Sequence, residues 1–159
     1  MKNIITLNIL FFCAIVFSFV SCSDDEGPAY NSIAEGSISM SHDGESWEST
    51  LVTGISVSGI NNYNALKSTE SQLSLTIENN SIGAYLLGEQ SLSAMTFSIN
   101  STAETYGSFE EELASGTITV EEENVSLQTI SGSFDAVLVD SDGNVKVISN
   151  GLFNKIRYN

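Results

Sequence analysis

The feature that most constrains the fold of this chain is a strict alternation of apolar and polar residues, which recurs from about residue 37 onward. A period of two places the apolar side chains of a strand on one face and the polar ones on the other, as in an antiparallel sheet with one face in water. We therefore expect the apolar members to face a core: Ile38, Met40, Ile55, Val57, Leu73, Leu75, Ile77, Met95, Phe97, Ile99, Ile118, Val120, Phe134, Ala136 and Leu138.

Turn-forming residues separate these runs. They are Asp43-Gly44, Asn61-Asn62, Asn79-Asn80, Glu123-Asn124 and Asp142-Gly143-Asn144, and hairpins need such residues because they tolerate positive φ. The apolar positions of the last run change phase around Asn150-Gly151, which predicts a β-bulge. The sequence therefore predicts an all-β fold, either an antiparallel β-sandwich or a rolled β-barrel, of roughly eight to ten strands. It leaves the choice between sandwich and barrel open.

The start of the chain has the pattern of a signal peptide. Lys2 gives a basic start, residues 4–20 carry no charge, and a small residue precedes Cys22. Cys22 in this position resembles the lipobox of bacterial lipoproteins, in which the cysteine sulfur receives diacylglycerol, although Phe19 stands where that motif usually has Leu. We therefore predict that residues 1–21 are removed and that Cys22 is lipidated. An uncleaved membrane anchor and ordinary secretion are the alternatives.

An acidic segment follows the cysteine. Its residues are Ser23, Asp24, Asp25 and Glu26, followed by a Gly-Pro pair, a composition typical of a solvated tether. A serine followed by acids directly after the lipid cysteine also resembles the export signal of surface-exposed lipoproteins of the Bacteroidota. We predict a flexible tether over residues 22–32 and a single β domain over residues 33–159. The predicted location is the outer membrane, facing the cell exterior, with its periplasmic face as the alternative.

The charge balance excludes one class of partner. The chain has twenty Asp plus Glu against five Lys plus Arg, and its formal net charge is −15 at pH 7. Nucleic-acid binding needs clustered basic side chains that displace counterions from phosphates, so we expect no nucleic-acid partner. Electrostatic attraction to anionic lipid is also excluded. We therefore expect the lipid on Cys22 to provide the membrane contact.

Several short motifs follow one another in a recognisable order. They are His42-Asp43-Gly44-Glu45-Ser46-Trp47, Ile82-Gly83-Ala84-Tyr85-Leu86, Gly116-Thr117-Ile118-Thr119-Val120, Ile130-Ser131-Gly132-Ser133-Phe134 and Ser149-Asn150-Gly151-Leu152-Phe153. This order, behind a lipobox, resembles a family of small Bacteroidota lipoproteins of unknown function that are built as single β domains. The resemblance runs from about residue 36 to residue 157. It implies fold and location, but no activity and no functional residue beyond Cys22.

No arrangement of residues points to catalysis or metal binding. The one histidine, His42, lies in a predicted turn, where we expect it to be exposed rather than to serve as a base. The acidic runs at residues 110–112 and 121–123 are typical of solvated surfaces. The segment Asp140-Ser141-Asp142-Gly143-Asn144 begins like a calcium loop, but Val145 stands where that loop needs Gly. We therefore expect no catalytic residue, no metal and no cofactor, and we expect Trp47 to lie in the core.

These patterns predict a lipid-anchored binding or structural module without catalytic activity, whose glycan or protein partner the residues do not identify. Two alternatives stay open. A barrel with an unfilled interior would carry a small apolar or sugar ligand, and two carboxylates roughly 5–10 Å apart across a cleft would support glycan hydrolysis. A structural role would require an exposed apolar patch larger than a few hundred Å².

Overall fold

The computed structural model describes residues 27–88, 90–108 and 113–159, which form eleven antiparallel strands and contain no α-helix. The strands are β1 (Ser37–His42), β2 (Glu45–Ser49), β3 (Leu51–Val57), β4 (Ile60–Lys67), β5 (Ser71–Ile77), β6 (Gly83–Leu87), β7 (Ala94–Ile99), β8 (Glu104–Gly107), β9 (Ser115–Asn124), β10 (Thr129–Val139) and β11 (Val145–Arg157). The predicted signal peptide, lipidation site, export signal and acidic run at 110–112 lie outside the described residues.

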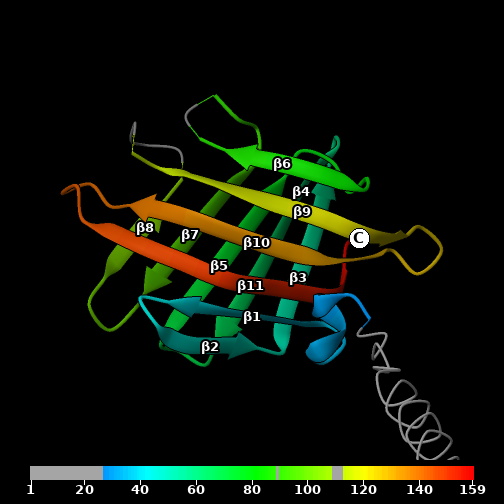
Figure 1. Cartoon of the computed structure of the whole chain (residues 1–159), viewed down its shortest axis with the longest axis horizontal. Helices are drawn as coiled ribbons and strands as arrows, with labels where there is room; N and C mark the ends of the chain where they lie inside the picture. The colour runs from blue at the N-terminus through cyan, green and yellow to red at the C-terminus, as the bar shows by residue number, and fades with distance from the viewer. Residues whose placement is uncertain (1–26, 89, 109–112) are drawn as a thin grey trace, which may run out of the picture.

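Two layers of strands cross one another (Figure 1). One layer has the order β6-β9-β10-β11-β1-β2 and the other has the order β8-β7-β5-β4-β3. The layers join where Val139 of β10 pairs with Gly107 of β8. At β3, the backbone N–H of Ser56 donates to the carbonyl of Asn159, at 3.0 Å. The result is a nearly closed, barrel-like antiparallel sheet, which confirms the predicted all-β fold.

Apolar side chains from both layers fill the space between them. Trp47, Tyr63, Phe97 and Phe153 are among the largest side chains that are fully buried. The Trp47 and Phe97 rings meet edge to face with their centroids 6.1 Å apart, and the indole N–H of Trp47 donates to the Ser71 hydroxyl at 2.8 Å. The predicted core position of Trp47 is confirmed, as are the buried faces of β1, β5, β7, β9 and β10.

The third strand faces the opposite way from the prediction. Ile55 and Val57, which we expected in the core, are 59% and 65% exposed, whereas Gly54, the residue before Ile55, lies on the inner face and is buried. A Cβ atom at Gly54 would lie far closer than 3.0 Å to the carbonyl oxygen of Arg157. The end of β11 therefore occupies the space that an apolar side chain of β3 would need. Because side chains alternate, this contact turns Leu51, Ile55 and Val57 outward, whereas Val52 remains on the inner face, partly buried against the core.

The predicted turns are correct in most places. Asp43-Gly44 joins β1 to β2 with φ values of 49° and 86°, and the 140–144 segment joins β10 to β11. The turn predicted at Glu123-Asn124 is wrong, because these residues end β9 and the chain turns after them, at residues 125–128. The turn predicted at Asn61-Asn62 is also wrong, because both residues belong to β4. The chain turns at Ser58-Gly59 instead, with φ values of 54° and 84°. These two residues supply the positive φ at both central positions that a short hairpin requires.

Two bulges shape the last strand, and the first confirms the predicted phase change. Phe134 pairs with Gly151 and Ala136 with Ile148, so β11 has one additional residue there. A second bulge follows, because Ile130 pairs with Ile156 and Gly132 with Phe153. Lys155, within the second bulge, has a φ of 47°. An additional residue locally bends and twists the strand, and here it re-aims the end of β11 toward β3.

The N-terminal segment is packed on the barrel before β1 begins. The predicted tether extends to residue 32, whereas the short 3-10 helix η2 (Ala29–Ser32) lies against β10 and β11 and buries the Tyr30 ring. The side-chain amide of Asn154 donates to the carbonyl of Ile33 at 2.9 Å. The packed part of the chain therefore starts at about Tyr30, and the segment before β1 is held against β11.

Candidate binding cleft

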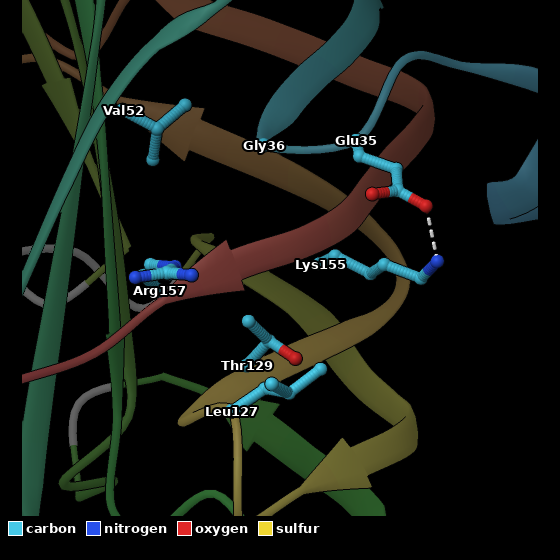
Figure 2. Close-up of a pocket in the computed structure, with 7 residues that line it drawn as sticks. All are labelled: Glu35, Gly36, Val52, Leu127, Thr129, Lys155 and Arg157. Carbon is cyan, nitrogen blue, oxygen red and sulfur yellow. Dashed lines mark hydrogen bonds and ion pairs between the residues drawn. The ribbon is translucent and has the colours of Figure 1, made fainter.

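A cleft opens between the end of β11, the start of β10 and the inner edge of β3. Its volume is about 310 Å³, at the lower end of the range for small-molecule sites. Figure 2 shows Lys155 and Arg157 extending from β11, with Val52 across the cleft on β3. The lining residues are Glu35, Gly36, Val52, Leu127, Thr129, Lys155 and Arg157.

The strand pattern of β11 places two cations on the cleft. Lys155 and Arg157 are two residues apart, so both side chains leave the same face of the strand, whereas Ile156 between them is fully buried. The bulge at Lys155 is supported by its backbone N–H, which donates to the Ser131 hydroxyl at 3.0 Å. These two side chains are two of the five Lys and Arg residues of the whole chain.

The two cations differ in their partners. The Lys155 ammonium forms an ion pair with the Glu35 carboxylate, shown by the dashed line in Figure 2, and this carboxylate raises the pKa of Lys155. Arg157 is exposed and forms no ion pair with any residue in the described ranges. Its guanidinium is planar and offers five N–H donors, which suit a carboxylate or phosphate. Arg157 is thus the cation available to a ligand.

The surroundings of Arg157 combine this charge with apolar surface. Val52 and Leu127 border the cleft, and Leu127 is exposed at the tip of the β9–β10 hairpin. Salt screens charges that are farther away than about 8 Å at physiological ionic strength, so the nearest side chains dominate the field at the cleft despite the net charge of −15. The arrangement can hold an anionic group beside Arg157 and an apolar group against the aliphatic side chains.

A second cleft, of about 340 Å³, surrounds His42 and also includes Glu45, Lys67 and Glu70. The prediction that His42 is an exposed turn residue is wrong, because His42 ends β1 and is half-buried. Its ring lies over Phe97 with the centroids 5.0 Å apart. The register of β1 decides this outcome, since it turns the His42 ring toward the aromatic core.

The position of His42 predicts a pH-dependent stability. Burial, and secondarily the positive charge of Lys146, lower its pKa below the ordinary 6.5. The unfolded chain therefore binds the proton more readily, so the associated stability is fully present above about pH 6.5 and decreases as the pH falls below it. We expect the Tm to be lower at pH 5.5 than at pH 7.5, and this difference to be smaller in His42→Gln. Thermal unfolding followed by circular dichroism measures both.

Asp43, the neighbour of His42, also contributes a pH-dependent stability, but over a different pH range. Its carboxylate forms an ion pair with Lys146 at 2.8 Å, and hydrogen bonding from that ammonium is the main cause that lowers its pKa below 3.8. The contribution of Asp43 is therefore lost only at much lower pH than that of His42. An equal Tm difference in wild type and His42→Gln would show that His42 does not cause the change above pH 5.5.

The described acidic residues of the predicted solvated runs do not converge on either cleft. Glu121 accepts a hydrogen bond from the Ser133 hydroxyl at 2.8 Å. Asp140 accepts from the backbone N–H groups of Asp142 and Asn144 at 2.9 and 2.8 Å, and so closes the β10–β11 turn. The segment that begins like a calcium loop is thus a hairpin turn. Within the described ranges no three His, Cys, Asp or Glu side chains are grouped as metal ligands.

One feature of the sequence other than the alternation of apolar residues points to the cleft. In a chain this acidic, two cations separated by one apolar residue near the C-terminus stand out, and a period of two puts them on one face. Glu35, the ion-pair partner of Lys155, lies 120 residues before it, so only the folded chain brings the three side chains together. No helix in the part of the chain that the structure describes is long and apolar enough to cross a membrane.

Comparison with known proteins connects this fold to a family but to no activity. Neither the search of curated proteins nor the search of solved structures finds a match. A family model described as a domain of unknown function, DUF6252, matches residues 34–157. This match covers β1 to β11, including both clefts. The chain therefore belongs to the DUF6252 family.

Proposed function

We propose that the protein is a lipid-anchored module, displayed on the outer face of the outer membrane, that binds a ligand through a carboxylate or phosphate group and does not catalyse a reaction. The observation that carries the binding role is the cleft at the end of β11. There, Arg157 is exposed beside Lys155 and has no ion-pair partner in the described chain. A bidentate Arg–oxyanion contact gives both affinity and orientation.

The anchoring part of the proposal rests on the residue pattern around Cys22. A cysteine directly after an apolar signal segment is the site where a lipoprotein receives its acyl chains, and the acidic residues after it suit outward display. Gly27 and Pro28 are exposed, and the chain is packed from Tyr30 onward. Residues 22–28, when fully extended, span roughly 25 Å. The tether would therefore keep the barrel close to the membrane surface.

The packing of the barrel supports a surface site rather than an interior one. The predicted core residues Leu75 and Phe97 are fully buried and Phe134 nearly so, and they occupy the space in which a barrel-type carrier would hold its ligand. For a carboxylate hydrolase, a general acid needs a raised pKa. The opposite holds at Asp43 and Asp140, whose hydrogen bonds lower the pKa. We therefore favour ligand binding without chemistry.

Substitution of Arg157 tests the binding role. In Arg157→Gln we expect the affinity for inorganic phosphate and for acetate to fall at least about 10-fold, because a charge-assisted hydrogen bond contributes roughly 1.5–3 kcal/mol. The measurement is a titration of the full-length chain in detergent by NMR at low ionic strength. In the wild type, saturable shifts are expected at the amides of Val52, Leu127 and Thr129.

Lys67→Gln is the matched control for this titration. Lys67 lines the other cleft, so its removal changes the net charge by the same amount and leaves the Arg157 site intact. We expect this variant to bind both anions like the wild type. Shifts that do not saturate, or an equal loss of affinity in the two variants, would mean that only the overall charge matters and that the cleft is not a binding site.

A further inference from the structure

The outer face of the layer β8-β7-β5-β4-β3 has a composition unlike the rest of the molecule. The strand registers arrange its outward side chains in cross-strand rows. The first row is Leu51, Leu66, Gln72, Ser98 and Thr105; the second is Thr53, Asn64, Ser74, Thr96 and Gly107; the third is Ile55, Asn62, Thr76 and Ala94; the fourth is Val57 and Ile60. None of these residues is charged. We call this surface the neutral face.

Charged residues border the neutral face without belonging to its rows: Glu104 begins β8, and exposed Glu78 directly follows β5. Other acidic residues lie in the opposite layer. Glu121 and Asp135 are exposed on β9 and β10, and Glu48 is exposed on β2, all in the other layer. Figure 1 shows that this layer lies across the barrel from the strands of the neutral face. The outward rows of the layer β8-β7-β5-β4-β3 thus hold no charged side chain, whereas the outer surface of the other layer carries these three carboxylates.

The polar side chains of the neutral face bind one another. The Asn62 amide donates to the hydroxyls of Ser74 and Thr76, at 3.0 and 2.9 Å, and the Gln72 amide donates to the Asn64 side-chain oxygen at 3.1 Å. These bonds fix the side chains before any partner arrives and satisfy part of their hydrogen-bonding capacity. A partner that covers this face therefore causes a smaller loss of side-chain conformational entropy, and the desolvation of these polar groups costs less.

A stripe of aliphatic side chains borders the polar rows. Leu51, Ile55 and Val57 of β3 are 58%, 59% and 65% exposed, and they share the outward face of that strand with Thr53, which lies between Leu51 and Ile55. Single exposed apolar residues are ordinary, but three on one face of a strand, beside an uncharged surface, favour burial against a partner. The structural role that the sequence analysis kept open required such an exposed apolar surface.

From these observations we infer that the neutral face is the interface for a second copy of this chain. Two chains with a charge of −15 repel each other, and face-to-face packing through an uncharged layer directs their charged layers apart. A charged partner would lose its hydration here without gaining a counter-charge. The face supplies both donors and acceptors through its amides, so it is complementary to itself in a two-fold arrangement.

The size of the face sets the expected strength of the dimer. Five strands about 4.8 Å apart, each about six residues long at roughly 3.3 Å per residue, give a footprint of about 20 Å by 20 Å. Stable interfaces bury about 800 Å² per partner, and this footprint of about 400 Å² is about half that size. We therefore expect a weak, reversible dimer that forms only as the protein concentration is raised. This inference depends neither on the Arg157 cleft nor on lipid anchoring.

Sedimentation velocity of the full-length chain in detergent, over about 5 μM to 500 μM protein, tests the inference. The wild type is expected to shift from monomer to dimer across this range. Ile55→Lys is expected to weaken the dimer roughly 100-fold, because like charges that meet in an interface cost several kcal/mol. This substitution makes the chain less negative, so weaker association cannot result from greater overall repulsion.

Leu86→Lys is the matched control. Leu86 is 70% exposed on β6, in the other layer, and its replacement makes the same change in charge and size class. We expect this variant to dimerise like the wild type. A wild type that stays monomeric to 500 μM overturns the inference and leaves the face for a different uncharged partner. A dimer that Ile55→Lys does not weaken, or that both variants weaken equally, also overturns it.

Discussion

Replacement of Cys22 by serine is expected to move the protein almost entirely from the membrane fraction to the soluble fraction. Each buried methylene of an acyl chain contributes about 0.8 kcal/mol, so two or three chains on Cys22 form a lasting anchor that serine cannot carry. The net charge of −15 offers no compensating attraction to anionic lipid. Cell fractionation with a carbonate wash, followed by immunoblotting, measures the distribution.

Cys13→Ser is the control for this experiment, because Cys13 lies within the predicted signal peptide and is expected to be dispensable for attachment. If Cys22→Ser remains in the membrane after carbonate washing, the lipoprotein proposal is wrong. Protease treatment of intact cells then addresses orientation. Loss of the wild-type domain while a periplasmic protein survives supports outward display, whereas protection until the outer membrane is opened places the domain on the periplasmic side.

Substitution of Gly54 by alanine is expected to lower the free energy of unfolding by about 3 kcal/mol and the Tm by about 10 °C. The added Cβ would lie much closer than 3.0 Å to the carbonyl oxygen of Arg157, and backbone atoms cannot yield as a flexible side chain can. Relief of the clash requires the end of β11 to move away from β3. Urea and thermal denaturation measure the loss of stability.

Gly83→Ala is the matched control. Gly83 lies on β6, and a Cβ atom there meets no atom within 4 Å. Alanine restricts the unfolded chain more than glycine does, so this variant is expected to be as stable as the wild type or slightly more stable. Equal stability of Gly54→Ala and wild type would mean that the contact between β3 and Arg157 is not needed to close the barrel.

The sequence alone was sufficient for the fold class and for most of the core. The alternation correctly predicted buried Leu75, Phe97 and Phe134, because a period of two separates the faces of a strand wherever it lies in the sheet. The bulge at Asn150 was also predictable, since an additional residue necessarily shifts the phase of the apolar positions. These features depend on residues that are close together in the chain.

The cleft could be predicted only in part. Lys155 and Arg157 share one face of a strand by their spacing, but Glu35 reaches Lys155 only because the segment before β1 packs on β11. The environment of His42 was likewise not predictable, since its neighbour Phe97 belongs to β7 in the other layer. Local sequence indicates which side chains share a face, whereas the partners opposite that face come from distant parts of the chain.

The orientation of the two faces of β3 shows most clearly which features the sequence determines and which depend on the tertiary structure. The pattern of residues 51–57 by itself determined that Ile55 and Val57 share one face of this strand and that Gly54 lies on the opposite one. The tertiary structure decided which face is buried, because the Arg157 carbonyl fills the space next to Gly54 and leaves room only for the smaller side chains. An alternating strand can be turned over without changing its pattern, so the choice depends on the available volume, which only packed neighbours define.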